Sequence, residues 1–176
     1  MLFHETALAG TFILEPEYHR DERGFFARVA SVDAFESRGL VGRFTECSVS
    51  FNHRRGTLRG MHYQAAPSAE TKLVRCTRGA IYDVAIDLRP ASPTYRRWIA
   101  EELSDENRRT LYIPAGCAHG FQTLTEGAEV LYMIDAPYDP TLGRGVRWND
   151  PAFGVVWPDG ERIMNDRDRT YPDFHG

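Results

Sequence analysis

The chain has 176 residues, a length that suits one domain of ordinary size. Hydrophobic residues make up 42% of it and charged residues 26%, which is typical of a folded globular protein rather than a disordered one. The formal net charge of -4 argues against a general nucleic-acid binder, and no run of 18 apolar residues is present that could span a membrane.

Lysine is nearly absent from the chain. Of the 21 basic residues 20 are Arg, which leaves Lys72 as the single lysine. Biased codon usage explains the Arg excess but not why one lysine is retained at this position. The N-terminal residues lack the basic start and apolar core of a signal peptide, so we expect a cytoplasmic protein.

The first predicted element in chain order is a helix beginning near residue 32. Ser31 can cap it, Val32 and Phe35 give it an apolar face, and Gly39 suits its C-terminal stop.

From residue 72 onward the pattern favours strands. Lys72–Thr77 forms one, and Ala80–Leu88 alternates so that Ile81, Asp83, Ala85 and Asp87 share one face. Gly79 between them is free to take a positive φ in a tight connection. Further short strands are predicted at Thr110–Pro114, Ala118–Thr123 and Glu129–Ile134. Turn residues separate these strands at intervals of roughly ten residues, the pattern of an all-β sandwich or barrel.

Two stretches and the cysteines are less clearly patterned. Ser104–Arg109 is either a helical turn or a polar turn, and Trp157–Gly176 is expected to be a polar tail along the surface. Cys47, Cys76 and Cys117 match neither a disulfide framework nor a CxxC metal site, so we expect three small buried side chains.

Two segments resemble the paired motifs of the cupin superfamily, a small β-barrel fold. The first contains His62, Gln64 and Glu70, and the second is the PxGxxH element that ends at His119. Metal-binding cupins supply three His and one Glu from these motifs. Here Gln64 replaces one His and Glu70 lies farther along than usual, so we expect no metal site.

Without a metal, His62 is free to act as an acid or a base because its ordinary pKa lies near neutrality. Arg59, Lys72 and Arg75 lie close to it in sequence. Strict alternation would place Arg59 and His62 on opposite faces of one strand. For both to serve one site, the strand must bulge near Gly60 or Arg59 must reach around its end.

Taken together, the motifs resemble the dTDP-4-dehydrorhamnose 3,5-epimerase family, collinearly from about residue 10 to the C-terminus. The matching stretches are Asp21–Phe26, Gly56–Gln64, Lys72–Cys76, Tyr82–Arg89, Ser92–Tyr95, Ile113–Phe121, Trp148–Asp150 and Asp166–Arg169. The resemblance implies a mainly β fold, a cupin-type double-stranded β-helix (jelly-roll) barrel with one or a few short helices. It implies a single domain over residues 1–176, with N-terminal strands and a C-terminal tail packing on the barrel.

The resemblance also implies a homodimer that needs neither metal nor cofactor. Such an enzyme inverts carbons beside the ketone of a nucleotide-linked 4-keto-6-deoxyhexose. The implied reaction converts dTDP-4-dehydro-6-deoxy-D-glucose to dTDP-4-dehydro-L-rhamnose. The implied partners are therefore a nucleotide-diphosphate sugar and a second copy of the chain, with no nucleic acid and no membrane.

Residue roles follow from the same resemblance. His62 corresponds to the general base, Asp168 to the carboxylate that holds it, Tyr132 to the acid on the opposite face of the sugar, and Lys72 to the cation at the reacting centre. Substrate contacts are implied for Phe25, Glu46, Ser48, Arg59, His119, Tyr138 and, reaching the diphosphate from the neighbouring subunit, Arg23.

The chemistry supports these roles independently. Epimerisation beside a ketone removes a proton to form an enolate and returns one to the other face. It therefore needs a base, a differently placed acid and a positive group near the ketone oxygen. His62, Tyr132 and Lys72 supply one of each.

Two residues depart from the family pattern, and three other functions stay open. Glu46 stands where Gln is common, which bears on the nucleotide or sugar preference. Cys117 replaces a bulky aromatic and either widens the pocket or is compensated by a neighbour.

The alternative functions are a single-carbon epimerase or one acting on another nucleotide sugar, a metal-dependent cupin, and a non-catalytic sugar-binding cupin.

Overall fold

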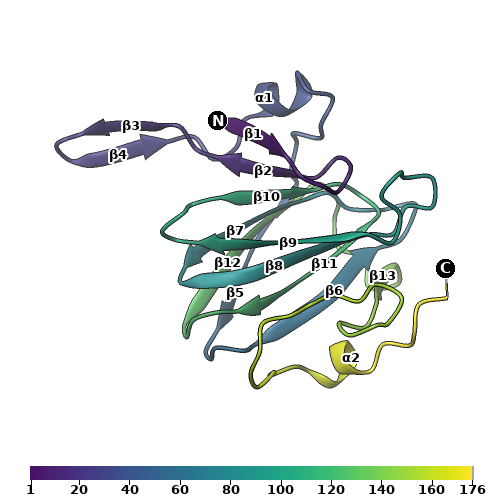
Figure 1. Ribbon diagram of the computed structural model, residues 1–176. Helices are drawn as coiled ribbons and strands as arrows, with labels where there is room; N and C mark the ends of the chain where they lie inside the picture. The colour runs from purple at the N-terminus through teal and green to yellow at the C-terminus, as the bar shows by residue number, and fades with distance from the viewer. Residues whose placement is uncertain (176) are drawn as a thin grey trace.

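Two antiparallel sheets face each other and enclose the largest cluster of buried side chains (Figure 1). The structure is a computed structural model, and it describes residues 1–175. Its strands are β1 (Leu2–Glu5), β2 (Phe12–Glu15), β3 (Tyr18–Asp21), β4 (Gly24–Ala27), β5 (Glu46–Asn52), β6 (Leu58–Gln64), β7 (Lys72–Arg78), β8 (Ala80–Asp87), β9 (Trp98–Ser104), β10 (Thr110–Ile113), β11 (Cys117–Thr123), β12 (Ala128–Ile134) and β13 (Gly143–Gly145). The helices are α1 (Val32–Glu36) and α2 (Asp166–Arg169).

The strand order explains how distant parts of the sequence meet. One sheet has six strands in the order β1-β2-β10-β7-β12-β5, and the other has five in the order β13-β6-β11-β8-β9. Strands β3 and β4 form a separate hairpin that projects from the body of the molecule (Figure 1). The five strands predicted from residue 72 onward correspond to β7, β8, β10, β11 and β12. The prediction of a mainly β barrel or sandwich is confirmed.

Strand β8 shows how alternation builds the core. Ile81 and Ala85 point into the space between the sheets, where they pack with Phe121 and Val130. The other face of β8 is also buried because the chain after residue 146 covers it. Full burial of such an aliphatic side chain contributes about 1.5–3 kcal/mol relative to exposure.

The predicted helix exists but is short. Helix α1 has five residues, and Phe35 is its fully buried anchor, stacked on the Tyr112 ring at 5.7 Å. Ser31 occupies the N-cap position, but its side chain makes no capping hydrogen bond, so that part of the prediction is wrong. Gly39 follows with a φ of +70°, as a stop signal requires.

The segment Ser104–Arg109 is a polar turn, the second of the two forms considered for it. The Ser104 amide donates to the Asn107 side chain at 3.1 Å, and the Asn107 amide donates to Ser104 Oγ at 3.0 Å. The last segment follows the surface of the five-stranded sheet as expected, although it buries Trp157 and Asp168.

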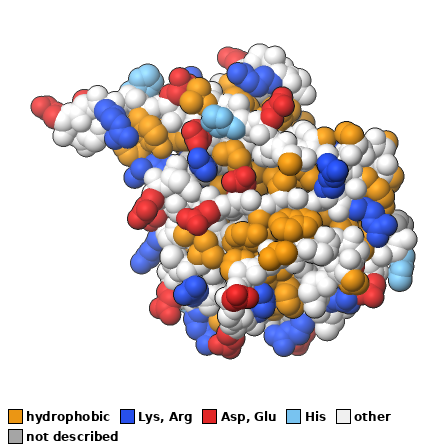
Figure 2. All heavy atoms as spheres, in the orientation of Figure 1, with side chains coloured by type: hydrophobic (Ala, Val, Ile, Leu, Met, Phe, Trp, Pro, Cys, Tyr) orange, Lys and Arg blue, Asp and Glu red, His pale blue; other side chains and the backbone are white. Residues whose placement is uncertain are grey.

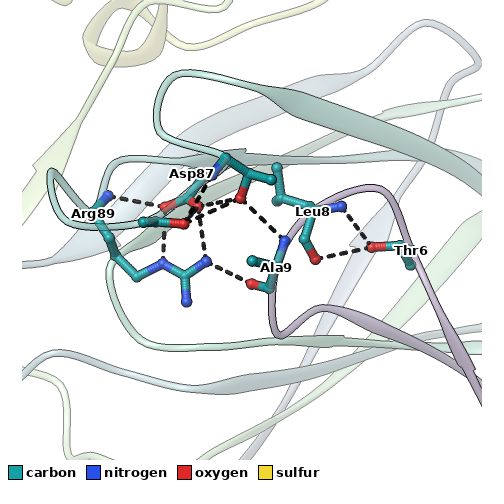
Figure 3. A network of polar contacts seen from close by, with 7 residues as sticks. Thr6, Leu8, Ala9, Asp87 and Arg89 are labelled. Carbon is teal, nitrogen blue, oxygen red and sulfur yellow. Dashed lines mark hydrogen bonds and ion pairs between the residues drawn. The ribbon is translucent and has the colours of Figure 1, made fainter.

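A hydrogen-bonded network ties the N-terminal loop to the end of β8 (Figure 3). Arg89 donates to the fully buried Asp87 through Nε and Nη2, each at 2.8 Å, and to the Ala9 carbonyl at 2.6 Å. Thr94 donates to Asp87 at 2.6 Å and accepts from the Ala9 amide at 3.1 Å. Burial opposes ionisation of Asp87, but the hydrogen bonds from Arg89, Ser92 and Thr94 outweigh it and lower its pKa to about 2.

The projecting hairpin exposes apolar side chains. Phe25 and Phe26 are 44% and 69% exposed, and Figure 2 shows hydrophobic and charged side chains together on this arm. Cys47 is exposed on β5, so the expectation that it is buried is wrong, whereas Cys76 and Cys117 are buried as expected. Among residues 1–175 no helix has the length and apolar character needed to cross a membrane.

Candidate active site

An open pocket of about 340 Å³ brings most of the predicted site residues together. Its lining comes from both sheets and from the C-terminal tail. It includes Ser48 from β5, Arg59 and His62 from β6, Lys72 from β7, His119 from β11, Tyr132 from β12, and Tyr138, Arg167, Asp168 and Tyr171 from the segments that follow β12.

The first feature of the pocket is a pair formed by His62 and Asp168. His62 Nε2 lies 2.8 Å from Asp168 Oδ1, and the Gly60 amide donates to Asp168 Oδ2 at 3.0 Å. The Asn165 side chain caps α2 by accepting from the Asp168 amide at 2.7 Å, which fixes the backbone that carries the carboxylate.

This environment keeps Asp168 ionised. Burial alone would raise the pKa of Asp168. The hydrogen bond and charge of His62, the Gly60 amide and the charge of Arg167 outweigh burial, so the pKa lies below its ordinary value. An ionised carboxylate on one ring nitrogen leaves the other nitrogen of His62 to exchange a proton with a bound molecule, and stabilises the imidazolium that results.

A bulge in β6 places Arg59 and His62 in the same pocket. His62 pairs with His119 and Arg59 pairs with Phe121, so β6 uses one more residue than β11 over this stretch. Gly60 has a φ of +126°, and a Cβ there would lie 2.5 Å from Gly120 Cα. The bulge near Gly60, one of the two arrangements considered, is confirmed, and it needs glycine for both conformation and space.

A second His–Asp pair lies deeper in the barrel. His119 Nε2 is 2.6 Å from Asp83 Oδ1, and both side chains are almost fully buried. Asp83 Oδ2 has no hydrogen-bond partner among residues 1–175. Burial raises the pKa of Asp83, and the charges of His119 and Lys72 only partly oppose this. Neither the sequence pattern nor the family resemblance assigned Asp83 a role. Its position on the same face of β8 as Ile81 and Ala85 nevertheless indicated a buried carboxylate.

Lys72 lies between the two pairs. Its Nζ is 2.8 Å from Glu70 Oε1 and 3.5 Å from the His62 carbonyl oxygen, and the residue is 6% exposed. Glu70, which a metal-binding cupin would use as a ligand, is thus the counter-ion of the lysine. A buried ammonium group at this point can neutralise negative charge that develops in the pocket.

The cupin metal positions are used differently in this chain. The Gln64 amide donates to the carbonyls of Ser68 and Pro137 and accepts from the Asp139 amide, so it ties loops together. Within the described part of the chain no group of three or more His, Cys, Asp or Glu side chains is arranged to hold a metal ion.

The two tyrosines of the pocket differ in exposure. Burial, with the nearby charge of Asp83, strongly raises the pKa of Tyr132, so its hydroxyl stays protonated. Its ring contacts His119 edge-on at 6.0 Å. Tyr138 is 62% exposed at the rim, where its amide donates to Glu46 Oε1 at 3.2 Å.

Three predicted substrate contacts do not line the pocket of their own chain. Glu46 lies beside the rim through its bond to Tyr138, while Arg23 and Phe25 are on the projecting hairpin. The Arg23 side chain is 84% exposed and pairs with Asp21 of the same hairpin.

Cys117 also lies away from the pocket. It packs in the interior cluster and pairs across β11 and β8 with Asp87. The expectation that it widens the pocket is therefore wrong, whereas compensation by a neighbour stays a prediction.

Two pocket residues from the tail were not identified from the sequence. Arg167 Nη2 is 3.4 Å from His62 Nε2, and the Tyr171 ring centroid is 6.2 Å from that of His62. The tail has no periodicity that would indicate which side chains face the barrel, and the matching stretch Asp166–Arg169 implied a role only for Asp168.

Comparisons with known proteins point to one enzyme family. A family model described as dTDP-4-dehydrorhamnose 3,5-epimerase matches residues 5–176. The enzyme of that name from Salmonella typhimurium is 44% identical over 161 residues, which cover 90% of this chain and 86% of the relative.

Solved structures of proteins with the same name are also similar. The one from Elizabethkingia anophelis has a TM-score of 0.96 at 37% identity, covering 99% of this chain and 96% of the other. One from Bacillus anthracis, with TDP and PPi bound, has a TM-score of 0.93 at 39% identity and covers 98% and 99% of the two chains. The predicted fold class is thereby confirmed.

Proposed function

This chain belongs to the dTDP-4-dehydrorhamnose 3,5-epimerase family, and from that premise we propose how its pocket works. It epimerises C3 and C5 of dTDP-4-dehydro-6-deoxy-D-glucose to give dTDP-4-dehydro-L-rhamnose. The observation that carries the proposal is a single pocket in which a base held by an ionised carboxylate, a protonated tyrosine and a buried ammonium group converge.

His62 is the base of the proposed reaction. It removes the proton beside the ketone, and the bonding electrons move onto the ketone oxygen to form an enolate. Asp168, held ionised by its hydrogen bonds, stabilises the imidazolium. A positioned base of this kind contributes roughly 10²- to 10⁴-fold in rate.

Lys72 and Tyr132 complete the proton transfer. The ammonium group of Lys72, next to the His62 carbonyl, stabilises the negative charge on the enolate oxygen. Tyr132 returns a proton to the opposite face of the sugar. His119 supports this arrangement because it pairs with His62 across β6 and β11 and contacts the Tyr132 ring, so the base and the acid lie on two sides of it.

Substrate binding is assigned to the remaining polar lining and to the rim. Ser48, Arg59 and His119 face the pocket, and Tyr138 is exposed at its mouth. Glu46 is placed by its bond to the Tyr138 amide, where its carboxylate can accept hydrogen bonds from the nucleoside.

Arg23 and Phe25 act in a second copy of the chain, so the working unit is a homodimer. The hairpin that carries them projects from the barrel with both side chains exposed, and neither lines the pocket of its own chain (Figure 1). An Arg from the partner would grip the diphosphate, which Arg does through paired hydrogen bonds. We propose that the reaction takes place in the cytoplasm.

Proton exchange with solvent tests the reaction. The enzyme is incubated in D₂O with dTDP-4-dehydro-6-deoxy-D-glucose, and deuterium is read at each carbon by NMR. We expect deuterium at C3 and at C5. Deuterium at one carbon would narrow the activity to a single-carbon epimerase, and none at either carbon would refute the proposed substrate.

Subunit complementation tests the dimer. His62→Ala and Arg23→Ala proteins are mixed after reversible dissociation, which yields hybrids with one intact site. Statistical mixing of a two-fold dimer should restore about a quarter of the wild-type activity. Activity no higher than that of the separate variants would contradict a contribution of Arg23 across subunits.

A further inference from the structure

On one side of strand β6, the residue paired with His62 is a glycine, which carries no side chain. Strand β13 pairs with β6 so that Gly145 faces His62, while His119 faces it from the other neighbour, β11. Directly opposite residues of an antiparallel pair place their Cβ atoms about 4.5–5.5 Å apart and normally pack against each other. Glycine at this position therefore leaves one flank of His62 open to another part of the chain.

Tyr171 from the C-terminal tail fills that space. A Cβ on Gly145 would meet three carbons of the Tyr171 ring, at 2.2, 2.3 and 2.8 Å. Unlike Gly60, Gly145 does not adopt the left-handed backbone conformation, so the ring alone excludes a side chain here. The Tyr171 ring meets the His62 ring edge-on, with centroids 6.2 Å apart and planes at 72°, which is a favoured aromatic geometry.

The tail is anchored on the far side of Tyr171. Arg147 donates to the Tyr171 carbonyl at 3.4 Å and pairs with Asp173 at 2.5 Å. The Phe174 amide donates to the buried Asp150 at 2.7 Å. Asp168, three residues before Tyr171, is hydrogen-bonded to His62. The chain is therefore anchored on both sides of Tyr171.

We propose that Gly145 and Tyr171 form a notch that holds the His62 imidazole in its reactive orientation. Both are positioning residues for proton transfer, and the inference rests on the proposed role of His62 as the base. The Asp168 hydrogen bond fixes one ring nitrogen but permits the ring to turn about that bond. The edge contact with Tyr171 on one flank and the His119 strand on the other restrict this rotation.

A double-mutant cycle tests the notch. Gly145→Ala adds one methyl group that the Tyr171 ring cannot accommodate without moving. We expect kcat to fall roughly 10- to 100-fold, since a displacement of about 1 Å can cost that much, with KM changed less than about 3-fold. Tyr171→Ala should also lower kcat. In the Tyr171→Ala protein, adding Gly145→Ala should not lower kcat further, because the ring that clashes with the new methyl group is absent.

The conservative variant Tyr171→Phe keeps the ring and should restore kcat to within about 3-fold of wild type, which separates ring packing from any role of the hydroxyl. The notch would be overturned if Gly145→Ala left kcat unchanged. It would also be overturned if Gly145→Ala lowered kcat by the same factor in wild type and in Tyr171→Ala. If Gly145→Ala does not fold, Tyr171→Ala and Tyr171→Phe decide the question, because equal kcat in the two would refute it.

The same assays separate this inference from the proposed function. Deuterium exchange is measured for wild type and for His62→Ala alongside the cycle. A wild type that exchanges no deuterium, or a His62→Ala variant that still does, refutes the base assignment and the notch with it. An active wild type, an inactive His62→Ala and an unaffected Gly145→Ala refute the notch alone.

Discussion

The two His–Asp pairs have similar contacts but opposite electrostatics. His62 and Asp168 join strand β6 to the C-terminal tail, and the His62 side chain is 32% exposed to the pocket. His119 and Asp83 join the neighbouring strands β11 and β8, and the His119 side chain is only 4% exposed. The pKa of Asp168 is lowered, whereas that of Asp83 is raised.

Burial raises the pKa of both carboxylates, and the two pairs differ in how far other contacts offset it. Asp168 Oδ2 accepts from the Gly60 amide, and Arg167 adds a positive charge nearby. Asp83 Oδ2 has no hydrogen-bond partner in the described range 1–175. A hydrogen bond to histidine therefore does not by itself offset the cost of burying a carboxylate. The pair whose histidine opens onto the pocket suits proton transfer, and the fully buried pair suits orienting His119.

The largest effect should come from removing the charge of Asp168. Asp168→Asn leaves the shape but loses the carboxylate that stabilises the imidazolium, so we expect kcat to fall roughly 10³-fold. Asp83→Asn is the matched control. Because Asp83 contacts the buried His119 and not the base His62, its kcat should fall less than about 10-fold. Steady-state kinetics of both variants provides the measurement, and equal losses would contradict the distinction.

A smaller loss of kcat is expected on substitution of Lys72, which interacts with both His–Asp pairs. Its Nζ lies 3.5 Å from the His62 carbonyl oxygen, and its charge acts on Asp83. Lys72→Arg keeps the charge but replaces a compact ammonium with a planar fork, so we expect roughly 10²-fold lower kcat. Binding of dTDP, measured by calorimetry, should change less than about 3-fold. Near-normal turnover in Lys72→Arg would contradict a specific role for the lysine ammonium group in catalysis.

The smallest effect on turnover is expected at Asp87, a buried carboxylate that no histidine contacts (Figure 3). Its folded-state pKa of about 2 lies below the ordinary 3.8. It therefore stabilises the fold above that ordinary value, and the contribution of about 2 kcal/mol is lost as pH falls toward 2.

Asp87→Asn should therefore lower the free energy of unfolding at pH 7 and flatten its decline in acid, with kcat unchanged. Urea titrations at several pH values measure both quantities. A variant as stable as wild type at pH 7 would show that this network contributes little.

Local patterns predicted five of the strands and part of the site, but not the N-terminal strands, β9 or β13. Alternation and turn residues located β7, β8, β10, β11 and β12, and the opposite faces predicted for Arg59 and His62 left two arrangements, of which the bulge at Gly60 is the one observed. The bulge could be anticipated because it resolves a conflict within one strand. The exposure of Cys47 was misjudged because composition does not reveal which face of a strand is exposed to solvent.

The tail was beyond prediction from periodicity. Asp168 was found only through the family resemblance, and Arg167 and Tyr171 were missed. Their positions depend on anchors far away in sequence, such as the bond from the Phe174 amide to Asp150. Long-range contacts of an irregular segment leave no repeating signal in the chain.

The most direct test of the central claim compares deuterium incorporation by His62→Ala and His119→Ala. The rate at C3 and C5 of dTDP-4-dehydro-6-deoxy-D-glucose is measured in D₂O under saturating substrate. We expect His62→Ala to lose roughly 10³-fold or more and His119→Ala to lose less than about 30-fold, because the second contacts substrate without taking its proton. An equal or larger loss in His119→Ala would assign the base to the buried pair and contradict the account.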